Sequence, residues 1–162
     1  MVNRDQQEEL REQLEALEMR SQKRWVKWSR ARFEYREAYV RELVNLTRLS
    51  GCLFIARYRH TRRYNEATAR AAVQSIQARG EGAYRVRIVV DGLTAGEKRQ
   101  FVRLVRDLGV RPDDVRGGRE ESNAFIRLAD ALCGLVRDVE DGQSWAIQAL
   151  NRLQRRGLVV EL

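Results

Sequence analysis

Two apolar segments, each carrying one acidic residue, constrain the fold of this chain more than any other feature. The first, Y-R-V-R-I-V-V-D-G-L, predicts a buried strand over 84–90 that stops at Asp91 and a glycine. The second, E-S-N-A-F-I-R-L-A-D-A-L-C-G-L-V-R-D, predicts a helix over 122–139 that is apolar around most of its circumference. Asp130 lies in it where a hydrophobic residue would fit. Acids at a strand end and on a packed helix are what a metal-dependent phosphodiesterase site needs.

The helix over 122–139 has two distinct faces. Its apolar stripe consists of Phe125, Leu128, Ala129, Leu132, Leu135, Val136 and Val139. At about 100° per residue, Asp130 lies roughly 160° from the centre of that stripe. The face around Asp130 carries Asn123, Ile126, Cys133 and Gly134, with Arg127 and Arg137 beside it. This face is too apolar and too rich in small residues to be an ordinary solvated one, so we expect another segment to approach it closely.

Each acid also has a plain structural interpretation. In this interpretation Asp130 is a surface residue that pairs with Arg127 or Arg137. Asp91 fits a turn before Gly92, a position where aspartate is common. Both interpretations stay open beside the metal site.

Length and composition indicate one domain over 1–162, with a cytoplasmic location. No apolar run approaches the roughly 20 residues of a membrane span, and no signal peptide opens the chain. Cys52 and Cys133 follow no ligand spacing, and the chain has one histidine, which argues against a zinc site. Reduced thiols in a bacterial-type cytoplasm are the expected state of both cysteines.

Positive charge is concentrated in residues 20–63. Residues 1–19 have a net charge of −4, whereas residues 20–63 contain thirteen Lys or Arg and three acids, a net charge of +10. Aromatic residues are interleaved with these bases, which suits nucleic acid, because cations neutralise phosphates and aromatic rings stack on bases. The residues assigned to this contact are Lys23, Arg24, Lys27, Trp28 and Arg30. The alternative is a long helix whose aromatic residues pack inward and whose arginines are solvated.

Strands that alternate with helices predict an α/β fold with a small, partly parallel sheet. The expected helices cover 5–20, 22–49, 65–79, 97–108, 122–139 and 143–156, and the expected strands cover 51–59, 84–90 and 158–162. R-P-D-D-V-R-G-G-R predicts a turn with room for a short strand. We expect the three strands to form one sheet, covered by the helices 97–108 and 122–139. An exposed edge of this sheet would favour a homodimer or a partner chain that completes it.

Several motifs resemble the bacterial domain-of-unknown-function 3800 family, which has a ribonuclease-H-like fold. The matching motifs are Val90-Asp91-Gly92, Glu121-Ser122, the run Arg127-Leu128-Ala129-Asp130 with Gly134 and Arg137, and Lys27-Trp28-Ser29. The resemblance covers about residues 22–140, flanked by an acidic helix over 1–20 and a terminal helix and strand over 143–162. The family's leading D-E-S-G strand is absent from this sequence. The resemblance therefore implies an incomplete ribonuclease-H-like fold, a helix-rich α/β structure in which helices flank a small mixed sheet.

The resemblance also implies a site and a reaction. Asp91 and Asp130, with help from Glu121, would hold Mg²⁺ or Mn²⁺ for phosphodiester hydrolysis, with weakened or lost activity because two of the family's acids are missing. Such a site requires the carboxylates of Asp91 and Asp130 to lie within about 8 Å of each other. The alternative is a non-catalytic nucleic-acid-binding or assembly protein that uses the basic helix 20–63.

Overall fold

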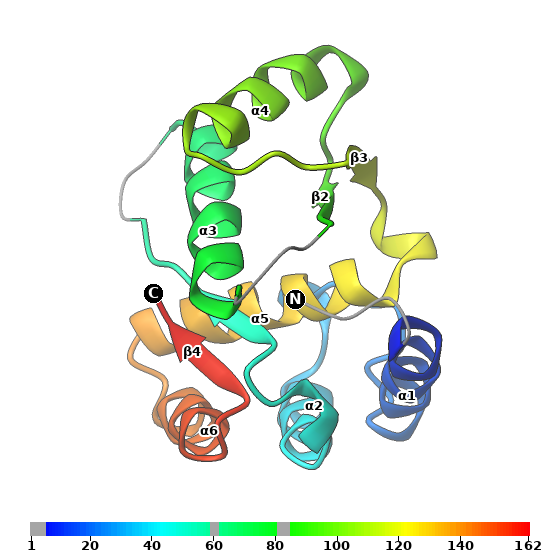
Figure 1. Cartoon of the computed structure of the whole chain (residues 1–162). Helices are drawn as coiled ribbons and strands as arrows, with labels where there is room; N and C mark the ends of the chain where they lie inside the picture. Colours follow the sequence, from blue (N-terminus) through cyan, green and yellow to red (C-terminus); the bar gives the residue numbers. More distant parts are fainter. Residues whose placement is uncertain (1–5, 59–61, 81–84) are drawn as a thin grey trace. The chain divides into compact units, whose positions relative to one another are not determined.

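The structure, a computed structural model, describes residues 6–58, 62–80 and 85–162 (Figure 1). Its elements in chain order are α1 (Gln7–Arg20), η2 (Trp28–Arg30), α2 (Phe33–Leu43), η3 (Thr47–Leu49), β1 (Leu53–Ile55), α3 (Tyr64–Arg79), β2 (Arg87–Asp91), α4 (Ala95–Asp107), β3 (Asp114–Gly118), η4 (Glu120–Ser122), α5 (Ala124–Glu140), α6 (Ser144–Arg155) and β4 (Val159–Glu161), where η marks a 3₁₀ helix. The fold is mixed α/β and rich in helix, as expected.

The chain divides into two compact units. The sheet unit contains Phe54–Arg119 and Glu161–Leu162, and the helical unit contains Val2–Leu53 and Glu120–Val160. The two family-like aspartates are therefore in different units.

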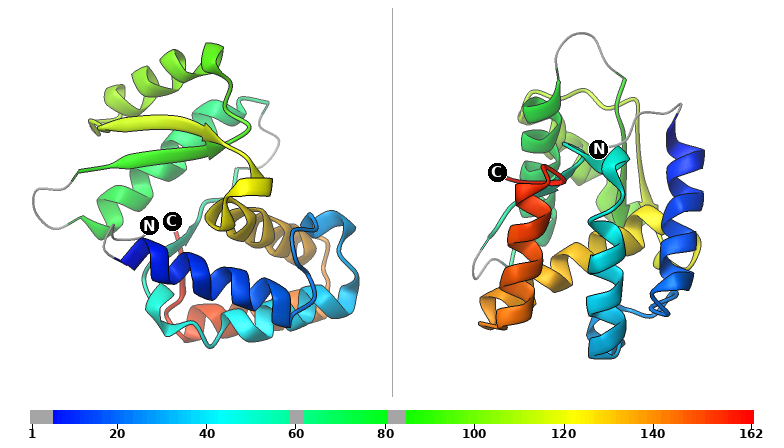
Figure 2. Two further views of the ribbon diagram at one scale, coloured as in Figure 1. Left: turned by 90° about the vertical axis from the view of Figure 1, so that its right-hand side faces the viewer. Right: turned by 90° about the horizontal axis from the view of Figure 1, so that it is seen from below.

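The sheet unit is built on a strand–helix–strand motif. β2 and β3 run parallel with Ile88 opposite Val115, and α4 connects them (Figure 2, left). Every second residue of a strand points to the same face, and Ile88 and Val115 are both buried. They share a core with α3, α4 and the adjoining loops, formed by Ala69, Val73, Ile76, Val86, Ile88, Leu93, Phe101, Val105, Val110 and Val115.

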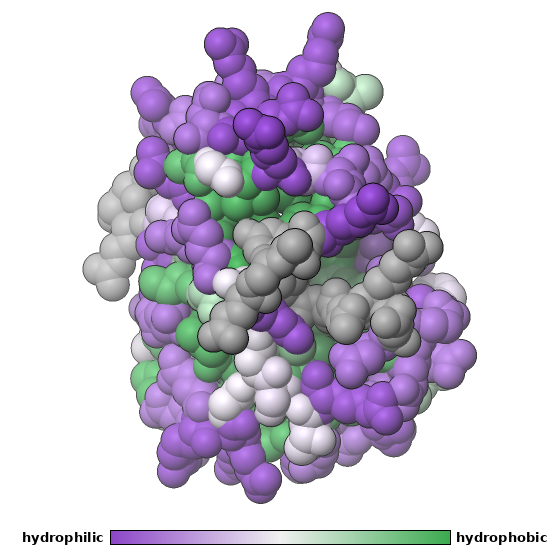
Figure 3. Space-filling model, in the orientation of Figure 1, coloured by the Kyte–Doolittle hydropathy of each residue, from purple (hydrophilic) through white to green (hydrophobic). Residues whose placement is uncertain are grey.

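α4 is capped by Thr94. The Thr94 hydroxyl accepts a hydrogen bond from the Glu97 N–H at 3.4 Å, and the Glu97 carboxylate accepts one from the Thr94 N–H at 3.1 Å. Two donors that the first turn would leave unpaired are satisfied in this way. Phe101 and Val105 are the fully buried residues of this helix. The outward side of α4, at the top of Figure 3, is correspondingly hydrophilic.

The strands pair differently from the prediction. β2 pairs with β3, and β1 pairs with β4 in a separate two-stranded sheet. The expected single sheet of 51–59, 84–90 and 158–162 is therefore wrong. β3 is the short strand that the prediction allowed within the run R-P-D-D-V-R-G-G-R. Its Gly117 is needed there, because a Cβ atom would lie 2.1 Å from the backbone oxygen of Leu93.

The helical unit is a layer of three helices crossed by a fourth. α1, α2 and α6 lie side by side in that order, and α5 runs across them (Figures 1 and 2, right). Each helix of the layer buries a stripe of apolar side chains, namely Leu10, Leu14 and Leu17 of α1, Tyr39, Val40 and Leu43 of α2, and Ala146, Leu150 and Leu153 of α6. The predicted helices 5–20, 122–139 and 143–156 are confirmed within one or two residues in the described part of the chain.

The predicted helix 22–49, and with it the basic helix within 20–63, is wrong. The segment contains a turn, η2, α2 and η3 in succession, and β1 follows it. Gln22 and Arg24 have φ values of 58° and 49°, which no right-handed helix accommodates. The helix that does form begins only at Phe33.

Smaller differences concern helix starts and chain segments. Arg63 rather than Asn65 precedes α3, and the Asn65 side chain instead donates to the Glu97 carboxylate at 3.1 Å. Residues 5, 59 and 84, at the ends of predicted elements, lie outside the described residues. In the part of the chain that is described, no helix has the length and apolar character needed to cross a membrane.

Candidate functional site

One face of α5 carries acidic and small residues at intervals of four. The helix starts at Asn123 rather than at the predicted Ser122, because the Asn123 side chain accepts hydrogen bonds from two N–H groups of the first turn at 3.0 and 3.3 Å. Asp130, Gly134 and Asp138 follow at positions i, i+4 and i+8, which lie on one side of a helix. This is the face that the sequence predicts to be closely approached.

The segment that approaches this face is η2, through Trp28. The backbone N–H of Trp28 donates to Oδ2 of Asp130 at 2.9 Å, and its indole N–H donates to Oδ2 of Asp138 at 2.9 Å. Between these contacts the indole lies over Gly134, where a Cβ atom would come within 2.1 Å of the ring. Asp130 thus satisfies a donor at the start of η2 that the short helix leaves unpaired. The prediction of a close approach is confirmed.

Further aromatic and cationic groups surround Trp28. Its ring lies against that of Trp145, with centroids 6.3 Å apart and planes at 22°, and Phe33 meets Trp145 edge-on at 5.3 Å. The Arg36 guanidinium lies 5.8 Å and 5.9 Å from the Trp28 and Trp145 rings and donates to Asp138 at 2.9 Å. These contacts fix η2 and the start of α2 against α5 and α6.

Glu18, near the end of α1, holds the preceding segment in place. Its carboxylate accepts from the Arg127 guanidinium of α5 at 2.7 Å, and both side chains are buried. Its backbone oxygen accepts hydrogen bonds from the Ser21 hydroxyl at 3.2 Å and from the Arg24 N–H at 3.0 Å. Tyr39 is also buried here; burial, and then the charge of Glu18, raise the pKa of its hydroxyl, so it stays protonated.

A tight turn follows α1 and is closed from inside by a lysine. The Lys23 ammonium is buried and donates to the backbone oxygen of Val26 at 2.8 Å, while it also lies 5.3 Å from the Tyr39 ring. The Val26 N–H in turn donates to the Lys23 oxygen at 3.2 Å. With Gln22 and Arg24 at positive φ, these bonds give the turn a defined shape.

The outer side of this turn is both basic and aromatic. We name residues 22–30 the basic–aromatic loop. Trp25 is 69% exposed, and Arg24, Val26, Lys27 and Arg30 are exposed with it. Within the described residues, neither the Arg24 nor the Arg30 side chain has a hydrogen bond or ion pair, and no acidic residue occurs between Glu18 and Glu34.

The nucleic-acid-binding residues predicted from sequence separate into two groups. Arg24, Lys27 and Arg30 are exposed on the basic–aromatic loop. Lys23 and Trp28 are buried, so their assignment as surface contacts is wrong. Lys23 closes the turn and Trp28 anchors it, and the aromatic residue of the basic–aromatic loop that does reach the surface is Trp25.

The predicted metal ligands are distributed over both units. Asp91 is exposed at the carboxyl end of β2, and Glu121 is exposed in η4 of the helical unit. Asp130 is half-buried and bound to the Trp28 N–H. Among the residues that the structure describes, no three His, Cys, Asp or Glu form a group that could hold a metal ion. Convergence of Asp91 and Asp130 stays a prediction.

Several residues of this site were missed in the sequence. Asp138 repeats the spacing from Asp130 to Gly134, and this regular interval was the available signal. Glu18 and Arg36 gave no local signal, because their partners are 109 and 102 positions away.

Comparison of the chain with protein-family models, with curated proteins and with solved structures finds no match in any of the three.

Proposed function

We propose that the protein binds single-stranded nucleic acid through the basic–aromatic loop and does so without cleaving it. The observation that carries this proposal is Trp25, a largely exposed indole on a turn held by buried hydrogen bonds and flanked by Arg24 and Arg30. Trp25 presents an aromatic ring to solvent beside these cations, where a planar group can stack on it.

The surroundings of Trp25 favour nucleic acid over a protein partner. Six Lys or Arg and no acid occur in residues 19–33. Trp and Arg are common at protein interfaces as well, so it is the uncompensated positive charge of this segment that favours a polyanion. Phosphates need cations, and a base stacks on an indole for about 1–3 kcal/mol. Stacking requires bases that are not already paired within a duplex, and for this reason the expected ligand is a single strand.

The interior of the site explains why the loop keeps its shape. Trp28, Lys23 and Glu18 attach it to α5 and α1, so little conformational entropy is lost when a strand binds. In this account Asp130 has a structural role, because it holds η2 under the loop.

The test is fluorescence anisotropy of a labelled single-stranded oligonucleotide over a range of salt concentrations. Trp25→Ala should weaken binding about tenfold, from the loss of stacking, and leave the salt slope unchanged because no charge is lost. Arg24→Gln and Arg30→Gln should each reduce the slope by about 1.

The matched control is Tyr64→Ala, which removes an equally exposed aromatic ring outside the loop. It should bind like the wild type. If Trp25→Ala and Tyr64→Ala behave alike, or if the wild type does not bind at low salt, the proposal is wrong, and the loop becomes a candidate protein interface.

A second candidate function is the metal-dependent phosphodiester hydrolysis implied by the family resemblance. The position of Asp91 favours it, because ligands of parallel α/β sheets bind beyond the carboxyl ends of the strands, and Asp91 is exposed at that end of β2. This function requires the Asp130 carboxylate to bind a metal ion while it also accepts the hydrogen bond from the Trp28 N–H.

A further inference from the structure

The outward face of α4, in the sheet unit, carries a row of arginines. Arg99, Arg103 and Arg106 are four and three positions apart, so they lie within an arc of about 60° at about 100° per residue. All three are exposed, on the side of the helix away from the buried Phe101 and Val105. Figure 3 shows hydrophilic side chains projecting at its top, where α4 lies. We name these three residues the α4 arginine row.

The α4 arginine row has no charge partner in the described part of the chain. None of its three guanidinium groups has a hydrogen bond or an ion pair there. Other cations of the sheet unit do have partners, since Arg87 and Lys98 lie 3.6 and 3.9 Å from Asp114. The two acids of α4 lie off the row: Glu97 binds the cap, and Asp107 is about 70° around the helix from the centre of the row. The charge of the row is therefore uncompensated.

The local electrostatics of α4 do not favour this arrangement. Like charges three or four positions apart on a helix repel each other, and Arg103 has such a neighbour on both sides, Arg99 and Arg106. The helix dipole favours cations only in the last turn. Arg106 lies in that turn, but Arg99 and Arg103 precede it. An anion along the row would replace the repulsion by attraction.

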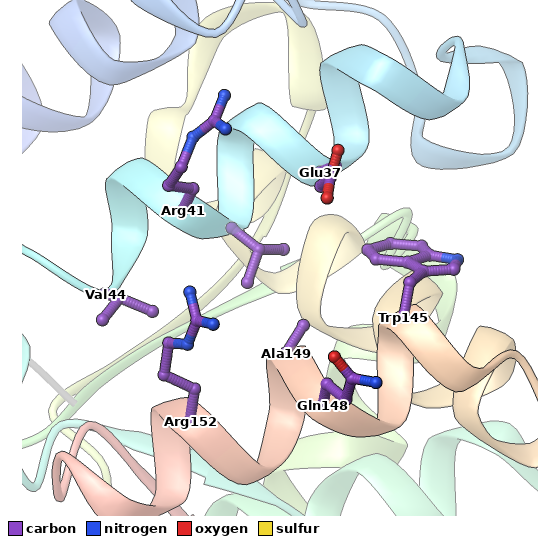
Figure 4. Close-up of a pocket in the computed structure, with 8 residues that line it drawn as sticks. Glu37, Arg41, Val44, Trp145, Gln148, Ala149 and Arg152 are labelled. Atoms are coloured by element: carbon purple, nitrogen blue, oxygen red, sulfur yellow. The ribbon is translucent and has the colours of Figure 1, made fainter.

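Two exposed arginines of the helical unit provide a contrast. In the groove between α2 and α6, Arg41 points away from α6, and Glu37 is one turn before it on α2 (Figure 4). Arg152 lines this groove from the last turn of α6, where the helix dipole favours a cation. A nearby acid or a helix end thus accounts for each of these charges, and neither accounts for Arg99 and Arg103.

The geometry of the α4 arginine row suits the phosphate backbone of a nucleic acid. A guanidinium can bind a phosphate through two parallel N–H groups. The row rises about 10.5 Å along the helix from Arg99 to Arg106, and three phosphate steps of about 3.4 Å along one strand of a duplex cover roughly the same distance. Among the described residues, no large apolar side chain of α4 is exposed, whereas the buried centre of a protein interface is apolar.

We propose that the α4 arginine row binds the phosphate backbone of nucleic acid, as a second contact separate from the basic–aromatic loop. The row has no aromatic ring on which a base could stack, so it contacts phosphates and does not distinguish bases. It therefore binds a duplex and a single strand alike, whereas the loop requires unpaired bases. This inference adds a contact to the proposed function, but it depends on the sheet unit alone.

The experiment measures binding of the full chain to a labelled DNA duplex by fluorescence anisotropy over a range of salt concentrations. The variant Arg99→Gln/Arg103→Gln/Arg106→Gln should bind at least about tenfold more weakly at low salt, and its salt slope should be lower by about 3. The matched control removes three exposed arginines from the end of α6, as Arg152→Gln/Arg155→Gln/Arg156→Gln. Its salt slope should change by less than about 1.

A charge-preserving variant, Arg99→Lys/Arg103→Lys/Arg106→Lys, separates an effect on binding from an effect on folding. It keeps three cations on the row and should retain most of the salt slope. A loss as large as that of the glutamine variant would overturn the inference, because the row would then act through something other than its charge. Equal duplex binding by the glutamine variant and the wild type also overturns it, as does absence of binding by the wild type at low salt. If poly-glutamate binds the row and the duplex does not, the partner is an acidic protein and the inference is wrong.

The variant Trp25→Ala distinguishes this inference from the proposed function. It should weaken binding of a single strand and leave binding of the duplex unchanged, because base stacking is not available in a duplex. If Trp25→Ala has no effect on the single strand, only the proposed function fails. If the glutamine variant of the α4 arginine row has no effect on the duplex, only the present inference fails.

Discussion

Gly134 of α5 determines how closely η2 can pack on that helix. Its missing side chain lets the Trp28 indole lie on α5 and so positions the loop that carries Trp25. Gly134→Ala would place a Cβ atom 2.1–2.7 Å from that ring. Since Trp28 is held through both its backbone N–H and its indole N–H, we expect a loss of unfolding free energy of about 1–3 kcal/mol, measured by urea denaturation.

Gly96 is the matched control for this substitution. It also lies in a helix, but the nearest atom to an added Cβ is 4.0 Å away. Gly96→Ala should leave stability unchanged or raise it by up to about 1 kcal/mol. Equal effects of the two substitutions would contradict the packing described for Trp28.

At these residues the sequence predicted a contact without identifying its partner. The small, apolar composition around Asp130 indicated a close neighbour, and the structure supplies one. Trp28 lies 102 positions away and belongs to a continuous helix in the prediction, so the sequence does not identify it as the partner of Asp130. The buried pair of Glu18 and Arg127 was equally invisible, since neither residue differs locally from a solvated one.

At the scale of the element, α4 shows how a cap links stability to pH. Hydrogen bonds from the Thr94 hydroxyl, the Thr94 N–H and the Asn65 amide lower the pKa of the Glu97 carboxyl. A carboxyl whose pKa is lower in the folded state stabilises the fold above its unfolded pKa, and this contribution is lost as pH falls through the folded value. Glu97→Gln should therefore be less stable than the wild type at neutral pH.

The difference between wild type and Glu97→Gln should shrink as the solution is acidified below the ordinary carboxyl pKa. Thermal denaturation at a series of pH values measures it. A difference that stays constant with pH would show that the ionised carboxylate of Glu97 contributes nothing to the cap.

Elements defined by local signals were predictable, and those defined by distant contacts were not. The helix predicted over 97–108 is α4 (Ala95–Asp107), whose apolar residues Phe101 and Val105 lie one turn apart. The segment 22–49 has helical periodicity too, but Lys23 bonds to Val26 and Asp130 bonds to the N–H of Trp28, and these contacts override it. The predicted strand pairing was wrong because β3, with the sequence D-V-R-G-G, lacks the alternation of apolar residues by which strands are recognised.

At the scale of the whole molecule, the positive charge is only partly compensated. The acidic helix α1 neutralises part of the basic segment, because its Glu9 pairs with Arg48. Arg20, at the end of α1, pairs in turn with Glu42 of α2. The basic–aromatic loop contains no acid that could compensate it. The positive charge predicted from the sequence is thus partly neutralised within the fold and remains available at the loop.

The most direct test of binding without cleavage is to incubate the protein with a labelled single strand in Mg²⁺ or Mn²⁺ and analyse both affinity and length. The variant Asp91→Asn/Asp130→Asn provides the comparison, because an asparagine at 130 keeps an oxygen for the Trp28 N–H. We predict that the strand stays intact and that wild type and variant bind it equally. Metal-dependent cleavage that the double variant abolishes would contradict this account and assign both aspartates to catalysis.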